Sequence, residues 1–195
     1  MEPTASAGEI RNRVSEAALL VVNLGNFKPT SKDLFILRLS EVSGGEPILR
    51  ERLFREALAS YDVQKVNGRI VVIENDLQGV VQPWAWMLLS ARLMPCAEAL
   101  FPGPWQATHE AEVIIQRFSR AWPPEKLHQQ RLFITGCGDI PAAAEVYCRL
   151  TAYVLPHVRS LMYGEACSAV PVYKSASKEL KPASPGPSGH AAQSE

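Results

Sequence analysis

Two glycine-flanked cysteines are the residues of this chain whose placement best suits chemistry. Cys137 lies in the run Gly136-Cys137-Gly138-Asp139, and Cys167 lies in Gly164-Glu165-Ala166-Cys167-Ser168. Each run follows an apolar segment that reads as a strand. If those strands are parallel neighbours in one sheet, their loops start within about 5 Å of each other. Two thiols there, beside a helix N-terminus that stabilises a thiolate, could bind a metal, transfer a persulfide or form a regulatory disulfide.

Few other ligands accompany this pair. Asp139 and His157 are the candidates for completing a metal site with the two glycine-flanked cysteines, and the sequence specifies no cofactor. The alternative is that both cysteines are small side chains packing under loops. Cys96 and Cys148 fit core packing better than chemistry. No cysteine sits in a C-x-x-C pair or in zinc-finger spacing, so free thiols in a reducing compartment are expected.

Two further patterns suggest binding. Gly136-Cys137-Gly138 before a helix could aim backbone N–H groups at an anion, but it lacks the third glycine of the dinucleotide fingerprint and the lysine of a P-loop. Trp84 and Trp86 lie on opposite sides of a predicted helix, so one belongs in the core and the other is a candidate interface residue. Burial of both indoles is the alternative.

No catalytic pattern accompanies these residues. The chain has no Ser-His-Asp order, no G-x-S-x-G elbow and no H-E-x-x-H helix. Carboxylates paired at a spacing suited to acid–base work are also missing. We therefore lean towards a protein that is not an enzyme.

Composition narrows the class of partner. Of 195 residues, 20 are Lys or Arg and 20 are Asp or Glu, so the net charge is zero. This balance argues against a nucleic-acid binder and against a polybasic membrane anchor. The first residues lack the layout of a secretory leader, and the apolar stretch 84–101 is interrupted by Arg92 and Glu98. A cytoplasmic protein is expected.

The hydrophobic pattern predicts a single domain over 10–174, between a flexible N-terminus (1–9) and a disordered tail (175–195) rich in Ser, Ala, Pro and Gly. The expected strands span 17–24, 34–39 and 69–74, and the expected helices span 48–61 and 108–122. Pro47 is expected in the first turn of the first helix, and Thr108 is expected to cap the second.

Two segments, 69–103 and 131–164, resemble each other. With one gap, Arg69 aligns with Arg131, Trp86 with Tyr147 and Gly103 with Gly164. Each segment reads as strand, loop, helix, proline break, strand and turn glycine. Chance likeness between two such units is the alternative to duplication. We expect an α/β fold: a mixed sheet with a duplicated strand–helix–strand unit, an N-terminal strand pair and helices packed on it, with ligand-binding loops at the carboxyl ends of the strands.

These motifs resemble a bacterial family known only as domain of unknown function 2480. The resemblance covers roughly residues 10–174 and rests on P-W-A-W-M-L from Pro83, on Gly136-Cys137, and on the run 164–174, which is the most specific. It implies a cytosolic protein whose relatives' genes tend to lie near iron–sulfur assembly genes. Relatives often carry proline where this chain has Ala166, and their first unit can also carry a loop cysteine where this chain has Asn75-Asp76. The missing third thiol weakens a cluster-binding interpretation.

Three hypotheses follow. The first is a non-enzymatic accessory protein linked to iron–sulfur or thiol metabolism through Cys137 and Cys167, with a candidate metal there. The second is a ligand-binding or protein-assembly module with structural cysteines, which uses the loop edge or a Trp-lined face. Either hypothesis allows a protein partner or a homodimer. A third hypothesis is an enzyme acting on a phosphorylated small molecule.

Overall fold

The computed structural model describes residues 19–46, 48–136, 138–165 and 168–175. Within them the strands are β1 (Leu19–Asn23), β2 (Leu34–Arg38), β3 (Ile70–Glu74), β4 (Ala99–Pro102), β5 (Arg131–Thr135), β6 (Ser160–Tyr163) and β7 (Val170–Lys174). The α-helices are α1 (Glu51–Ser60), α2 (Pro83–Leu93), α3 (Ala107–Ala121), α4 (Pro124–Leu127) and α5 (Ala143–Val154). Between these elements lie short 3₁₀ helices: η1 (Leu24–Phe27), η2 (Leu39–Glu41) and η3 (Val63–Val66).

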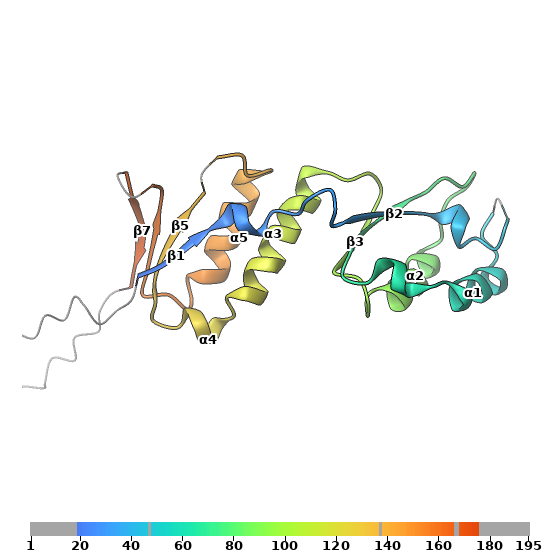
Figure 1. The fold of residues 1–195 in the computed structure, drawn as a ribbon, viewed down its shortest axis with the longest axis horizontal. Coiled ribbons are helices and arrows are strands. Elements are labelled where there is room, and N and C mark those ends of the chain that lie inside the picture. Colours follow the sequence, from blue (N-terminus) through green and yellow to red (C-terminus); the bar gives the residue numbers. More distant parts are fainter. Residues whose placement is uncertain (1–18, 47, 137, 166–167, 176–195) are drawn as a thin grey trace, which may run out of the picture.

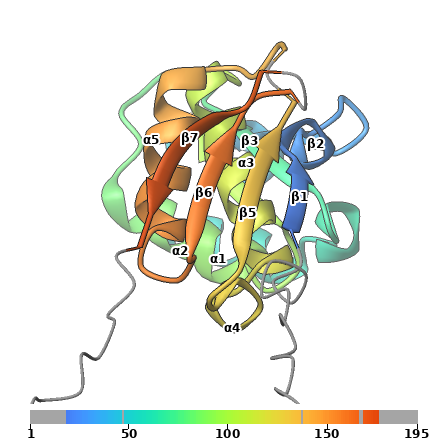
Figure 2. The ribbon, with the colours of Figure 1, turned by 90° about the vertical axis from the view of Figure 1, so that its left-hand side faces the viewer.

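The strands form two sheets. Sheet A has the order β1-β5-β6-β7, with β1, β5 and β6 parallel and β7 antiparallel to β6. Sheet B has the order β2-β3-β4 and is entirely parallel. Figure 1 shows the two sheets on opposite sides of α3, and Figure 2 looks onto the face of sheet A that no helix of the described residues covers.

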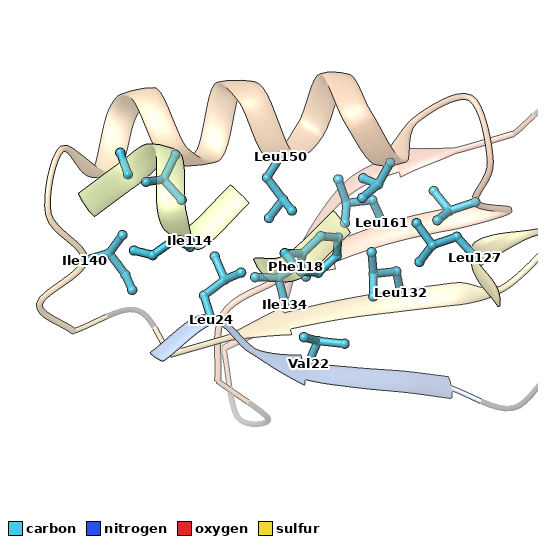
Figure 3. Close-up of a cluster of buried hydrophobic side chains, with 14 residues drawn as sticks. Val22, Leu24, Ile114, Phe118, Leu127, Leu132, Ile134, Ile140, Leu150 and Leu161 are labelled. Atoms are coloured by element: carbon cyan, nitrogen blue, oxygen red, sulfur yellow. The ribbon is translucent and has the colours of Figure 1, made fainter. Parts of the chain in front are cut away.

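Helix α3 contributes to the cores on both of its sides. Ile114 and Phe118 pack with the residues of sheet A and α5 that Figure 3 displays, while Val113 packs with Ile70 and Ala99 of sheet B. The other face of sheet B packs on α1 and α2 around Phe54. Because β3 is covered on both faces, Ile70 to Ile73 are all buried, as a continuous β-branched run predicts.

The predicted α/β class, with a mixed sheet and helices packed on it, is confirmed. A second, parallel sheet accompanies the mixed one. The expected N-terminal strand pair is wrong, since β1 pairs with β5 and β2 pairs with β3. Both strands are parallel to their partners, so each needs a long crossover connection and cannot close a hairpin with the other.

Several boundaries also differ from the prediction. Helix α1 begins at Glu51, three residues later than expected, and Pro47 lies outside the described residues. Helix α3 begins at Ala107 with Gln106 before it, so Thr108 is inside the helix and does not cap it. Strand β7 has no counterpart in the prediction, although Val170, Val172 and Tyr173 are β-formers; Pro171 obscured it and is tolerated because β7 is an edge strand.

The two similar segments fold in the same way. Segment 69–103 forms β3-α2-β4, and segment 131–164 forms β5-α5-β6. Ile70 pairs with Ala99 as Arg131 pairs with Ser160, and the backbone N–H of Gly103 bonds to Ile73 as that of Gly164 bonds to Ile134. These pairs keep one constant spacing along the chain. Ile70, not Arg69, is therefore the structural counterpart of Arg131, and no gap is needed.

The helices of the described segments include none with the length and apolar character needed to cross a membrane.

Candidate functional site

The loops that carry the predicted cysteines leave sheet A from neighbouring strands. β5 and β6 are parallel and paired, with Ile134 opposite Tyr163, and the N–H of Gly164 donates to the carbonyl of Ile134 at 3.1 Å. The loops after these two strands therefore start side by side at the carboxyl edge of the sheet. Cys137 and Cys167 themselves lie outside the described residues, as does Ala166.

Gly136 fixes the start of the first loop. Its φ is +88°, and a Cβ added there would overlap the side-chain oxygen of Asn23, at the end of β1. That Asn23 Oδ1 accepts a hydrogen bond from the N–H of Gly25 at 2.8 Å. Glycine is required at position 136 both for its backbone angle and for this close approach.

The rest of this loop is held in an unusual backbone conformation. Asp139 and Ala142 have positive φ values of 55° and 45°, which cost energy for residues with a Cβ. Lys28 Nζ donates to the backbone oxygen of Asp139 at 2.7 Å and to its Oδ2 at 3.0 Å. Helix α5 starts directly after Ala142, without a side-chain cap. The loop therefore carries local strain at the position where open α/β sheets bind ligands.

A cavity of about 340 Å³ lies between sheet A and α5. Its lining comes from both strands of the loop edge, from α5 and from β7: Ile134, Tyr147, Leu150, Thr151, Leu161, Met162, Tyr163 and Val172. None of these side chains is charged, and five are aliphatic or thioether. The volume falls in the range of small-molecule sites.

One buried polar atom of a lining residue lacks a hydrogen-bond partner among the described residues. The hydroxyl oxygen of Tyr147 is buried and accepts or donates no hydrogen bond within the described segments. The rings of Tyr147 and Tyr163 meet edge to face, with centroids 5.0 Å apart. Buried hydroxyls are normally paired, so this one is an exception, and its oxygen is closed off from the cavity even to a water-sized molecule.

The remaining predicted site residues lie elsewhere. His157 follows α5, and its backbone oxygen accepts from the N–H of Gln129 before β5, at the amino edge of sheet A. Asp139 lies beyond the carboxyl edge, so the structure does not bring these two candidate ligands together. Within the described ranges, no three His, Cys, Asp or Glu side chains gather in a way that could hold a metal ion.

The two remaining cysteines differ in burial, whereas the two tryptophans are alike. Cys96 packs against the core of sheet B, as predicted, but Cys148 is exposed on α5, so core packing is wrong for it. Trp84 and Trp86 are both half-buried against the sheet B core, and Trp84 meets the Phe54 ring edge to face at 5.8 Å. An interface role for either indole stays a prediction.

A cluster of ion pairs ties α3 to sheet B. Arg117 on α3 donates to both carboxylate oxygens of Glu98 at 2.7 Å and lies 3.3 Å from Asp33 Oδ2. Asp33 directly precedes β2 and Glu98 directly precedes β4, so these contacts link α3 to two loops that enter sheet B. A hydrogen bond from the Thr30 N–H, together with Arg117, keeps the pKa of Asp33 below its ordinary value despite partial burial.

A second pair joins α3 to α5, the helix that lines the cavity. Arg149 contacts Glu112, and Gln116 donates to Glu112 at 2.8 Å. Burial opposes ionisation of Glu112, but these hydrogen bonds and the Arg149 charge lower its pKa overall. The two helices that cover the inner face of sheet A are thereby tied together by charge-assisted bonds.

The fold and this edge of sheet A define an α/β protein with a small-molecule-sized cavity. The chain matches the family described as "Protein of unknown function (DUF2480)" over residues 8–175 and belongs to that family. The resemblance seen in the sequence is thus confirmed. No curated protein and no solved structure matches it.

Sequence reasoning located the loop edge but missed the cavity behind it. The one available signal was the alignment of the two segments, in which Tyr147 and Thr151 occupy the positions of Trp86 and Ser90. The larger Trp86 packs against the core of sheet B. A smaller aromatic ring at the same position of the second unit is consistent with the space beside Tyr147.

Proposed function

We propose that this protein binds a small apolar molecule in the cavity between β5, β6 and α5. The observation that carries this proposal is the cavity of about 340 Å³ between sheet A and α5, with no charged side chain in its lining. Burying an apolar ligand against Ile134, Leu150 and Leu161 would gain about 25 cal/mol for each Å² removed from water. This is the ligand-binding alternative raised by the sequence.

Access to the cavity offers a direct test. Val172 lines the cavity and is 49% exposed on the edge strand β7, while Val170, on the same strand, is 55% exposed and does not line it. Val172→Phe is expected to obstruct the cavity, and Val170→Phe is the matched control. Because both positions are exposed, neither variant disturbs the core.

The probe is naphthalene, followed by its own fluorescence on titration with protein. Wild type and Val170→Phe are expected to bind it with similar affinity, and Val172→Phe to bind at least tenfold more weakly. Absence of binding to the wild type, or equal binding by all three proteins, would overturn the proposed ligand site.

A second candidate function is a thiol pair formed by Cys137 and Cys167, acting in iron–sulfur or thiol metabolism. The pairing of β5 with β6 favours it, because the loops on which both cysteines lie start from adjacent parallel strands. Iodoacetamide labelling of wild type, Cys137→Ser and Cys167→Ser, combined with metal analysis, tests this candidate. Fast labelling or bound metal that depends on these two residues supports it. Slow labelling equal to that of Cys96, with no metal, rules it out.

We further propose that the two strand–helix–strand units arose by duplication. The constant spacing between their strand pairs and turn glycines supports this origin.

A further inference from the structure

We propose that α1 and α2 together dock an amphipathic helix of another protein, whose apolar face covers an exposed stripe of α2 and whose carboxylate lies beside Arg92. This docking surface is separate from the cavity of sheet A and does not depend on the proposed ligand. Three features of the described residues support it: an apolar helix with an uncovered side, a groove along that side, and an arginine without a carboxylate partner.

Helix α2 is apolar on nearly all of its sides. Within Pro83–Leu93 only Ser90 and Arg92 are polar. A helix that is apolar all round is normally buried on every side. The core of sheet B covers one side of α2, around Ala85 and Leu89. The opposite side is therefore expected to have a partner as well.

The uncovered side of α2 carries an apolar stripe. Met87, Ala91 and Met94 are four and three residues apart, so they lie on one face of the helix. Met87 is 72% exposed, Met94 is 48% exposed, and Ala91 is exposed between them. Methionine side chains are flexible and are common on surfaces that bind partner helices. This stripe suits the apolar face of such a helix.

A groove of about 430 Å³ lies beside the stripe, between α1 and α2. Four of its lining residues are apolar and two are arginines: Arg55, Leu58, Ala59, Leu88, Ala91 and Arg92. Because Ala91 belongs to both the stripe and the groove, the two form one continuous surface. Figure 1 shows α1 and α2 at the end of the molecule opposite sheet A. A helix lying in an apolar groove is a recurrent mode of protein recognition.

The charge of the groove specifies the partner. Arg92 Nε donates to the backbone oxygen of Leu58 at 3.1 Å. Its Nη2 donates to the backbone oxygens of Ala59 and Tyr61 at 3.3 Å. These bonds hold the guanidinium at the groove, but all three acceptors are neutral, so its charge has no carboxylate partner in the described part of the chain. A carboxylate on the docked helix would supply a charge-assisted hydrogen bond there.

A second copy of this chain does not offer that carboxylate from the same surface. Helix α2 has no acidic residue, and both acidic residues of α1 are already paired. Glu51 accepts from Arg55 at 2.9 Å. Glu56 accepts from Arg52 at 3.1 Å. In a twofold dimer the same surface meets itself, so the arginines would gain no new partner. The occupant we propose is therefore an acidic, amphipathic helix of a different protein.

The probe is a phage-displayed library of helical peptides of about 15 residues, randomised along one face and selected on the full-length protein. Enriched peptides are expected to carry an apolar stripe with at least one acidic residue at its edge. Replacing that peptide acid by its amide should weaken binding about fivefold. The selected peptides should bind Met87→Lys at least about tenfold more weakly than wild type. Lysine is chosen because it does not repel an acidic peptide.

Val170→Lys is the matched control, because Val170 is 55% exposed on β7, at the other end of the molecule. It should bind the peptides as wild type does. Met94→Lys is a second variant of the stripe, and both methionine variants should unfold at the wild-type temperature because the two side chains are exposed.

Three results would overturn the docking surface: no enriched peptide, enriched peptides without acidic residues, or equal binding by wild type and the methionine variants. Sedimentation without peptide tests the other occupant. A wild-type dimer that becomes monomeric in Met87→Lys would assign the surface to a second copy and would also overturn the proposal. None of these results bears on the cavity of sheet A.

Discussion

The side-chain oxygen of Asn23 occupies the space that a Cβ on Gly136 would need. This contact joins the end of β1 to the loop after β5 and sets the direction in which that loop leaves sheet A. The same glycine has a φ of +88°, which residues with a Cβ rarely adopt. The start of this loop is therefore fixed by the contact with Asn23 and by the backbone angle of Gly136, without any ligand.

Gly136→Ala is expected to destabilise the protein by at least about 2 kcal/mol, because the added methyl group must displace Asn23 and adopt an unfavourable φ. Gly138→Ala is the control, since nothing lies within 4 Å of a Cβ there. Urea unfolding measures both variants. Equal stability of the two would show that the Asn23 contact does not constrain the loop.

Ala142 has a φ of 45° and a ψ of 46° immediately before α5. Ala142→Gly is expected to stabilise the protein by about 0.5–1 kcal/mol, because glycine adopts this conformation without a Cβ clash. The control Ala144→Gly, two residues on and inside α5, is expected to destabilise by a similar amount. A loss of stability in both variants would contradict the strain at position 142.

Arg117 ties α3 to the connections of sheet B through Glu98 and Asp33. Its side chain is only 22% exposed, so we expect Arg117→Met to cost about 2 kcal/mol, because Glu98 keeps only the more distant Arg120 at 3.8 Å and Asp33 loses its arginine. Arg52→Met breaks an ion pair that is 81% exposed on the arginine side, and it should cost less than about 0.5 kcal/mol. A cost at position 117 no larger than at position 52 would contradict a structural role for the cluster.

Stability should also depend on pH through Asp33. Because the folded protein lowers the pKa of Asp33 below 3.8, its contribution is complete above that pH and is lost as the pH falls through the lower, folded value. The advantage of wild type over Asp33→Asn should therefore be full at pH 5 and should shrink towards pH 2.5. Unfolding free energies measured across this range test the sign. A constant difference would mean that Asp33 gains nothing from its ionised state.

Much of this fold is readable in the sequence, for physical reasons. The run Ile70–Ile73 is β-branched and continuously apolar, which is typical of a strand covered on both faces, and β3 is such a strand. The proline and glycine punctuation located both strand–helix–strand units. The sequence did not reveal that β1 and β2 belong to separate sheets. Parallel partners are far apart in the chain, and local patterns do not specify which two strands will pair.

The candidate site was only partly readable. The loop glycines revealed the edge of sheet A, since a glycine between a strand and a helix signals an unusual backbone angle. The cavity depends on how α5 sits over β5 and β6, and the size of the aromatic side chain at position 147 was its one trace in the sequence. Whether space remains depends on how all the side chains between α5 and sheet A pack together, and no short sequence motif specifies that packing.

The most direct test of the account is a titration of the ¹³C-methyl-labelled protein with naphthalene, followed by NMR. The account predicts that the methyl signals of Ile134, Leu150 and Leu161, which line the cavity, shift in a saturable way. The methyl signals of Leu89 and Leu93, in the filled core of sheet B, should stay in place. Shifts centred on the sheet B leucines, or no saturable shift at the cavity, would contradict the ligand site.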